Sequence, residues 1–397
     1  MLELTNSAVR VLDRPRVDSA RWAVGARFLI HGLIASTWIS RIPAIQSDLR
    51  LTNAHLGFCF LGTAVGSMVA VPITGWLISR FGSKQATSWS TLGFCLALAA
   101  PSLAFNGATL FCALTLFGAM GSANDVSMNS QGVAVESALA APIMSRFHAM
   151  FSIGGMAGAI VGGLLAGHEV GPRTHLCAAS AILLPVSIAT APHLLDADDR
   201  AQRHLPGIQL RRVPMVLVGL AVIGFCLFLS EGAIADWSAL YLKQVLGAGP
   251  GLAAAAFAAF SVGMSMFRLL GDHISARMGT VATVRRGALL AAGALSVALM
   301  VRSAHWALPC FALVGAGFAA IVPIVFGAGG RVRSVPSGAG IAAVSGSGYI
   351  GFLFGPPIIG IVAQQTSLRL ALFIVVGLSL VAASLANAVR RDEAEAA

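Results

Sequence analysis

The segment MGSANDVSMNSQG, from Met120 to Gly132, places one acid and three amides within an otherwise apolar and small-residue stretch. On a helix, Asp125 and Asn129 are one turn apart and form a polar stripe next to Asn124. An ionised side chain at the centre of a membrane helix costs about 2.5–3.5 kcal/mol, so it normally faces a cavity or a partner. We therefore expect Asp125 to couple protons and both asparagines to bind solute. The open alternatives are hydrogen bonds between packed helices for the amides, and a structural or gating contact near the cytoplasmic side for Asp125.

Two further ionisable residues occupy matching positions in the two halves of the sequence. His31 begins HGLIAS and Glu231 begins EGAIAD, at an offset of 200 residues. Each lies about ten residues, or about 15 Å of helix, from the end of its apolar run, close to the middle of a bilayer. Both are expected to couple protons and to contact solute, with a helix-packing hydrogen bond as the alternative.

Other polar residues give weaker signals. Arg27, one turn before His31, is expected to hold an anionic group, or alternatively to snorkel or pair. Asp236 and Trp237 are expected to contact solute, although Trp237 also fits an aromatic belt at the membrane surface. Gating roles are predicted for residues near the ends of the apolar runs: Arg80, Lys84, Arg146, His148, Arg268 and Asp272. Arg268 and Asp272, one turn apart, are expected to form an ion pair.

Composition determines what kind of elements hold these residues. Hydrophobic residues make up 57% of the 397 positions and charged residues 11%, which indicates an integral membrane protein. The net charge of +10 does not indicate nucleic-acid binding, because the basic residues form short clusters between apolar runs. No nucleotide-binding, metal-binding or catalytic motif is found, so neither cofactor, metal nor enzyme activity is expected.

Apolar runs of about twenty residues recur along the chain. They predict twelve membrane-spanning helices near 20–41, 54–79, 86–105, 108–134, 147–167, 173–193, 213–241, 251–272, 285–303, 305–328, 338–363 and 366–389. The polar stretch 193–212 predicts a cytoplasmic linker between an N-terminal six-helix bundle, 1–192, and a C-terminal one, 213–397. Most of the 26 Lys and Arg residues fall on the side of the termini, which places both termini in the cytoplasm.

The two halves also share sequence. LISRFG from Leu77 matches ISARMG from Ile274, so that Gly82 pairs with Gly279 at an offset of 197. The match of HGLIAS with EGAIAD precedes it, and a third match follows at an offset of 193, where Ser152, Gly155, Gly158 and Gly162 pair with Ser345, Gly348, Gly351 and Gly355. These matches predict a duplicated six-helix unit.

Several motifs resemble those of one family. GWLISRFGSKQ from Gly75 is similar to the loop signature of the major facilitator superfamily, with Ser79 where an acid is usual. Four stretches resemble the bacterial YbjJ-like branch: SRIPAIQSDL from Ser40, DVSMNSQGVAVE from Asp125, PIMSRFHAMFSIGGMAGA from Pro142 and EGAIADWSALYL from Glu231.

The resemblance implies an all-α membrane fold of two six-helix bundles that bind solute between them and alternate in access. We expect a proton-coupled secondary transporter of a small polar solute in the bacterial inner membrane, acting as a monomer whose partners are solute, protons and lipid. A drug or metabolite efflux antiporter is the alternative. The G-x-x-x-G-P element typical of drug antiporters is incomplete at Gly158 and Gly162, which counts against it.

Overall fold

The computed structural model describes residues 14–139, 143–196, 214–332, 335 and 337–390. In this part of the chain every regular element is a helix. The first half contains α1 (Arg14–Ile39), α2 (Ile42–Asp48), α3 (Asn53–Phe81), α4 (Ser83–Ala97), η1 (Ala100–Leu103), α5 (Gly107–Leu139), α6 (Met144–Gly167), α7 (Pro172–Thr190) and η2 (Ala191–His193). The second contains α8 (Met215–Gln244), α9 (Pro250–Met278), α10 (Thr280–Met300), α11 (Ala304–Phe318), α12 (Ile321–Gly329), α13 (Ser337–Gln365), α14 (Leu368–Ser384) and η4 (Leu385–Val389).

The predicted all-α fold is confirmed, with local differences from the twelve predicted spans. Within the described residues, eleven stretches of helix are long and apolar enough to cross a membrane. The predicted span without a counterpart among these eleven is the third, 86–105. It corresponds to α4 and η1, which are separate because Pro101 cannot donate a backbone hydrogen bond to a continuous helix. The span predicted at 305–328 is interrupted between α11 and α12, and the short α2 was not predicted.

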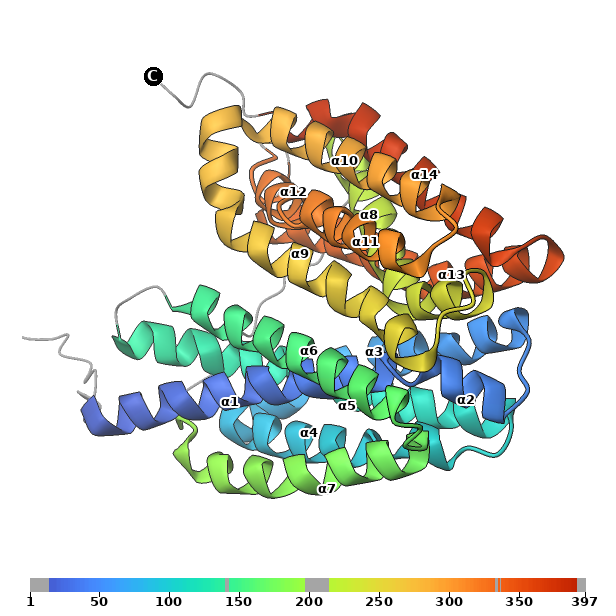
Figure 1. Cartoon of the computed structure of the whole chain (residues 1–397). Coiled ribbons are helices and arrows are strands. Elements are labelled where there is room, and N and C mark those ends of the chain that lie inside the picture. The colour runs from blue at the N-terminus through green and yellow to red at the C-terminus, as the bar shows by residue number, and fades with distance from the viewer. Residues whose placement is uncertain (1–13, 140–142, 197–213, 333–334, 336, 391–397) are drawn as a thin grey trace, which may run out of the picture.

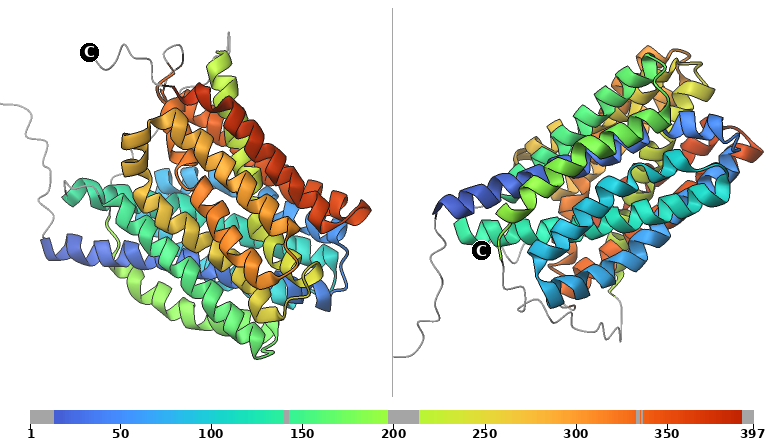
Figure 2. Two further views of the ribbon diagram at one scale, coloured as in Figure 1. Left: turned by 45° about the horizontal axis from the view of Figure 1, so that its top comes forward. Right: turned by 90° about the horizontal axis from the view of Figure 1, so that it is seen from below.

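Helix pairing follows the same order in both halves (Figures 1 and 2). In the first half α1 packs on α6, α3 on α5 and α4 on α5; in the second, α8 packs on α13, α9 on α11 and α10 on α11. The two groups meet through α3 with α13 and through α6 with α9. The boundaries 1–192, 193–212 and 213–397 stay a prediction, since residues 197–213 lie outside the described part.

Glycines at an offset of 197 residues make the same contacts in both halves. A Cβ atom on Gly118 of α5 would collide with the carbonyl oxygen of Thr63 on α3, and a Cβ on Gly315 of α11 would collide with that of Phe260 on α9. These contacts hold the paired helices at backbone distance, which only glycine permits. The spacing seen in the sequence thus recurs as a repeated packing geometry.

The turn between two helices is repeated as well. Gly82 ends α3 with φ 85°, and Gly279 ends α9 with φ 80°. Residues with side chains rarely adopt this left-handed backbone, so glycine at both positions lets the chain turn directly into the next helix.

Candidate solute and proton site

The two halves are in close contact at one end of the molecule, here called the far side, where α2 lies and α8 ends (Figure 1). A Cβ on Gly57 of α3 would come within 2.7 Å of the Pro356 carbonyl oxygen on α13, and a Cβ on Gly360 within 2.6 Å of the Asn53 carbonyl oxygen. Between α6 and α9, a Cβ on Gly251 would lie 3.0 Å from the Gly163 carbonyl oxygen. The backbones of the two halves therefore touch directly on the far side.

Three neutral amides bridge the same end. Gln46 donates to Asn53 (2.8 Å), Asn53 donates to Gln244 (3.2 Å), and Gln244 donates back to Gln46 (2.8 Å). Lys243 adds a bond of 3.1 Å to the Pro43 carbonyl oxygen. Because Lys243 and Gln244 lie on α8 and the other residues in the first half, these bonds join the halves.

A cavity of about 320 Å³ lies between the halves. Five aromatic rings line it, three from the first half and two from the second, together with small residues, hydroxyls and one carboxylate. The lining residues that matter below are Trp38, Phe60, Thr63, Phe117, Ser122, Gly232, Asp236, Tyr349 and Phe352. Most of this surface is apolar, which the polar motifs of the sequence did not predict.

His31 and Asn124 form one buried polar cluster in the first half. Asn124 of α5 is fully buried, and its Nδ2 lies 3.0 Å from Nδ1 of His31 on α1. Thr91 of α4 donates to Asn124 Oδ1, which orients the amide so that its NH₂ group points at the imidazole. In this arrangement His31 Nδ1 accepts, so a neutral ring carries its proton on Nε2. Asn124 thus joins three helices of one half, as in the alternative interpretation of this residue.

Asp125 points away from that cluster. Its side chain is exposed, and its described hydrogen bonds are with Asn129, which donates to Asp125 Oδ1 (3.2 Å) and to its carbonyl oxygen (2.8 Å). The carboxylate is close enough to act electrostatically on His31, on His148 of α6 and on Tyr349 of α13. Asp125 therefore lies between the halves, towards the end opposite the far side, here called the terminus side.

Glu231 is the corresponding acid of the second half. Its Oε1 atom is buried and has no hydrogen-bond partner among the described residues. Arg268 of α9 is its electrostatic neighbour and also acts on His148 in the first half. Electrostatic interactions thus link two acids, a histidine and an arginine that come from both halves. The structure brings together these four of the predicted site residues.

Arg27 does not join this group. It is fully buried on α1, and both its bonds go to Ser187 of α7: Nη1 donates to the hydroxyl (2.6 Å) and Nη2 to the carbonyl oxygen (2.8 Å). These contacts lie within the first half, so the arginine is engaged in the way that the pairing alternative describes.

Trp237 is also fully buried. Its ring packs edge-on against Phe60, with centroids 5.9 Å apart, and against Gly360 at the contact between the halves. In this state Trp237 supports the far-side contact and does not line the cavity.

The remaining predicted gating residues lie on the terminus side. Arg80 and Arg146 are exposed and have no ion pair with a described residue. Asp272 lies in α9, but its side chain is outside what the structure describes, and so is the predicted pair with Arg268. The gating roles stay predictions.

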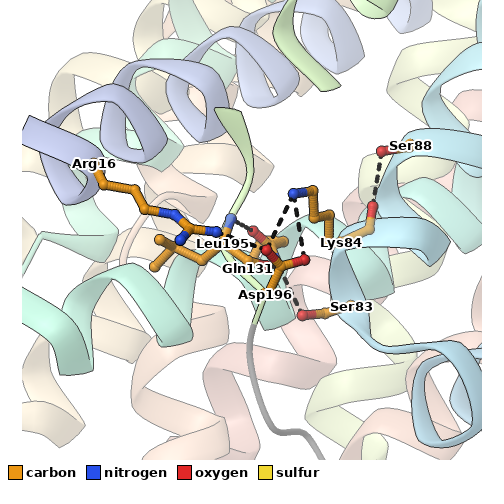
Figure 3. A network of polar contacts seen from close by, with 7 residues as sticks. All are labelled: Arg16, Ser83, Lys84, Ser88, Gln131, Leu195 and Asp196. Atoms are coloured by element: carbon orange, nitrogen blue, oxygen red, sulfur yellow. Dashed lines mark hydrogen bonds and ion pairs between the residues drawn. The ribbon is translucent and has the colours of Figure 1, made fainter. Parts of the chain in front are cut away.

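Lys84 belongs to a polar network that the sequence did not predict (Figure 3). Asp196, just after the last helix of the first half, accepts from Arg16 (2.8 Å) and Lys84 (3.3 Å). The buried Gln131 amide donates to Ser83 (2.7 Å) and to the Leu195 carbonyl oxygen (2.9 Å), and accepts from the Leu195 N–H (3.0 Å). Every member of this network lies in the first half, so it makes no contact across the halves.

Comparison with known proteins decides the family. The family model described as Major Facilitator Superfamily matches residues 24–333. An uncharacterized MFS-type transporter of Yersinia pestis is 34% identical over 92% of this chain and 94% of its own length. The chain belongs to the Major Facilitator Superfamily. It is a multi-pass membrane protein of this family of transporters, while membership of the YbjJ-like branch stays a prediction.

Two further similarities extend this result. The membrane protein MosC of Rhizobium meliloti is 33% identical over 91% of this chain and 88% of its own length. A mutant of the nucleoside transporter NupG superimposes with a TM-score of 0.76 at 14% identity, covering 94% of this chain and all of the other. At that identity the structural likeness shows the fold alone.

Proposed function

We propose that this chain is a secondary active transporter that moves a small polar solute across the bacterial inner membrane by alternating access, coupled to protons. It acts as a monomer without a cofactor, and both termini face the cytoplasm. The terminus side of the interface, where Asp125 and Arg268 are exposed, then faces the cytoplasm in this state. The Yersinia relative is described as an MFS-type transporter, which supports this proposal.

One observation supports the proposed proton coupling. Ionisable groups of the two halves interact electrostatically across the interface. Closing the terminus side would remove water from the exposed Asp125, His148 and Arg268, next to Glu231, whose Oε1 atom is already buried. Desolvated charges cost several kcal/mol each unless they pair or are neutralised. Taking up or releasing a proton at Glu231 or Asp125 changes that cost, so protonation and conformation become linked.

Transport into proteoliposomes tests the proposal. A thermal-shift screen of sugars, organic acids, amines and drugs first identifies a solute that stabilises the purified protein. Uptake of that solute is then followed with and without an imposed pH gradient. We expect accumulation above equilibrium only with the gradient.

Glu231→Gln provides the sharper measurement. The variant should lose accumulation driven by the pH gradient and keep solute exchange at equilibrium. Glu169→Gln, which changes an exposed acid outside the site, serves as the matched control. Full accumulation by Glu231→Gln would exclude this residue from coupling, and the absence of flux for any stabilising solute would exclude transport.

Efflux of a drug or metabolite is the second candidate, and the apolar, aromatic lining of the cavity favours it. The two candidates differ in direction. Cells that overexpress the protein should accumulate the solute if it is imported and retain less of it if it is exported. Deletion of the gene should have the opposite effect.

A further inference from the structure

The cavity between the halves combines one acid with several rings. Apart from the Tyr349 phenol, Asp236 is the only acidic or basic side chain among its described lining residues. The rings are those of Trp38, Phe60, Phe117, Tyr349 and Phe352. The lining therefore combines a single carboxyl group with a largely aromatic surface.

The Asp236 carboxyl group has no partner among the described residues. It forms no hydrogen bond or ion pair with any described residue, in contrast to Asp196 and Asp125. Arg268, the base that acts on Glu231 and His148, is not among the lining residues. A carboxylate in mainly apolar surroundings is costly without a counter-charge, and the described protein offers none. A bound ligand with a positive charge would supply it.

The rings stand close to this acid. A Cβ on Gly232, one turn before Asp236, would come within 2.8 Å of Phe352, so that ring packs on the same turn of α8. On the other side Phe60 contacts Trp237, the next residue after Asp236. The faces of aromatic rings attract cations within about 6 Å of their centres. The acid and the rings therefore both favour a ligand with a positive charge.

The size and the remaining polarity of the cavity narrow the ligand further. A volume of about 320 Å³ is at the small end of the range for small-molecule sites. The hydroxyls of Thr63 and Ser122 can meet one or two polar groups, whereas a polyhydroxylated solute would leave many of its groups against carbon. An anion would face Asp236 with no described base on the lining.

We propose that this cavity selects a compact organic cation, an amine protonated at neutral pH whose nitrogen pairs with Asp236 and whose body packs against Phe60 and Phe352. The inference rests on the proposed transport function, because it names the class of solute that the same site takes.

Three probes of similar shape and different charge distinguish the effect of ligand charge on binding from the effect of ligand size. They are phenethylamine (cationic), 2-phenylethanol (neutral) and 3-phenylpropanoate (anionic). Their affinities are measured by calorimetry on the purified full-length protein in lipid nanodiscs. Phenethylamine should bind roughly ten to a hundred times more tightly than the other two, as expected for a charged hydrogen bond with aromatic contacts. Asp236→Asn should abolish this preference, and Asp236→Glu should keep part of it.

Matched variants control the experiment. Asp48→Asn removes an exposed acid of α2 and should leave all three affinities unchanged. If Asp236→Asn fails to fold, Phe352→Leu takes its place, and it should weaken binding of the amine several-fold more than binding of the alcohol, because only the amine also loses the attraction between ring and cation.

Three outcomes would overturn the inference: equal binding of the three probes, no binding of the amine, or a cation preference that survives in Asp236→Asn. The experiment distinguishes failure of this inference from failure of the proposed function. Transport of a neutral or anionic solute in proteoliposomes would refute the amine site and leave the transport function standing. Amine binding without any flux would support the site and refute transport.

Discussion

The two ends of the interface between the halves are built from opposite kinds of residue. On the far side, glycine backbones touch and the polar contacts are mainly neutral amides, such as Gln46 and Gln244. On the terminus side, Asp125, His148 and Arg268 are exposed and do not bond directly across the halves.

This difference indicates how each end opens and closes. Neutral amides and glycine contacts can separate at a cost of about 1 kcal/mol for each hydrogen bond, because water replaces the lost partner. Charged groups cannot be brought together in a dry interface without pairing or proton exchange. Closing the terminus side is therefore the step that depends on proton binding. The far side closes by close packing of glycines and by neutral hydrogen bonds, without a proton.

The largest effect is expected from Gly57→Leu. A side chain there meets the Pro356 carbonyl oxygen, so the far side cannot close. Overpacking costs about 1–3 kcal/mol, which shifts the equilibrium towards the far-side-open state by about five- to 150-fold and slows transport accordingly. Distances between spin labels on the two halves should increase at that end.

Gly75→Leu is the matched control for Gly57→Leu, because a Cβ on this glycine of the same helix meets no atom within 4 Å. Equal label distances in the two variants would show that the glycine contact does not hold the far side closed.

Arg27→Ala tests a contact within one half. It removes both bonds to Ser187 and leaves a cavity, so the free energy of unfolding should fall by about 3 kcal/mol. Solute binding per folded molecule should not change, because Arg27 is fully buried against α7. Thermal unfolding and calorimetry measure the two quantities, and Arg21→Ala, at a partly exposed position of the same helix, is the control. A selective loss of binding would restore Arg27 as a solute ligand.

Asp125→Asn tests the charged end. We expect pH-driven flux to fall about tenfold, because one counter-charge for His148 and Arg268 is lost when the terminus side closes, at a cost of about 1.4 kcal/mol. Stability and solute affinity should stay close to those of the unmodified protein, since Asp125 is exposed in this state. Asp18→Asn is the control, and unchanged flux in Asp125→Asn would remove this acid from the gate.

Gln244→Leu should have the smallest effect. It removes three hydrogen bonds between neutral amides at the far side. These bonds are exposed or only partly buried, so together they should contribute only about 1 kcal/mol, and the far-side-open state should be favoured about fivefold. Label distances again report the shift, with Gln365→Leu at an exposed position of α13 as the control. A shift as large as that of Gly57→Leu would mean that amides, and not glycines, determine closure.

Much of the fold follows from patterns that sequence alone contains. Apolar runs marked the spans, and the match of Gly82 with Gly279 indicated a repeat that recurs in turns and helix contacts. The break between α4 and η1 at Pro101 and the separate α2 were missed, because such interruptions lie within or beside apolar runs and change their hydropathy little.

The site was less predictable. Asp125, Glu231 and Asp236 could be recognised because an acid in an apolar run needs a cavity or partner. Arg27 could not be separated from them, since a helix inside a bundle is buried on several faces and its partner Ser187 is 160 residues away. The ring-lined cavity was missed for the same reason, because aromatic residues in spans occur at every packing surface.

The backbone contacts of Gly57 with Gly360 and of Gly163 with Gly251 also determine at which step of transport the membrane voltage acts on a bound charge. A voltage falls mainly across the layer that excludes water and ions. In the proposed orientation that layer lies on the exterior side of Asp236, so an amine bound there is already near the electrical potential of the cell interior. Most of the roughly 2.3 kcal/mol per elementary charge that 100 mV supplies would then be exchanged when those glycines part.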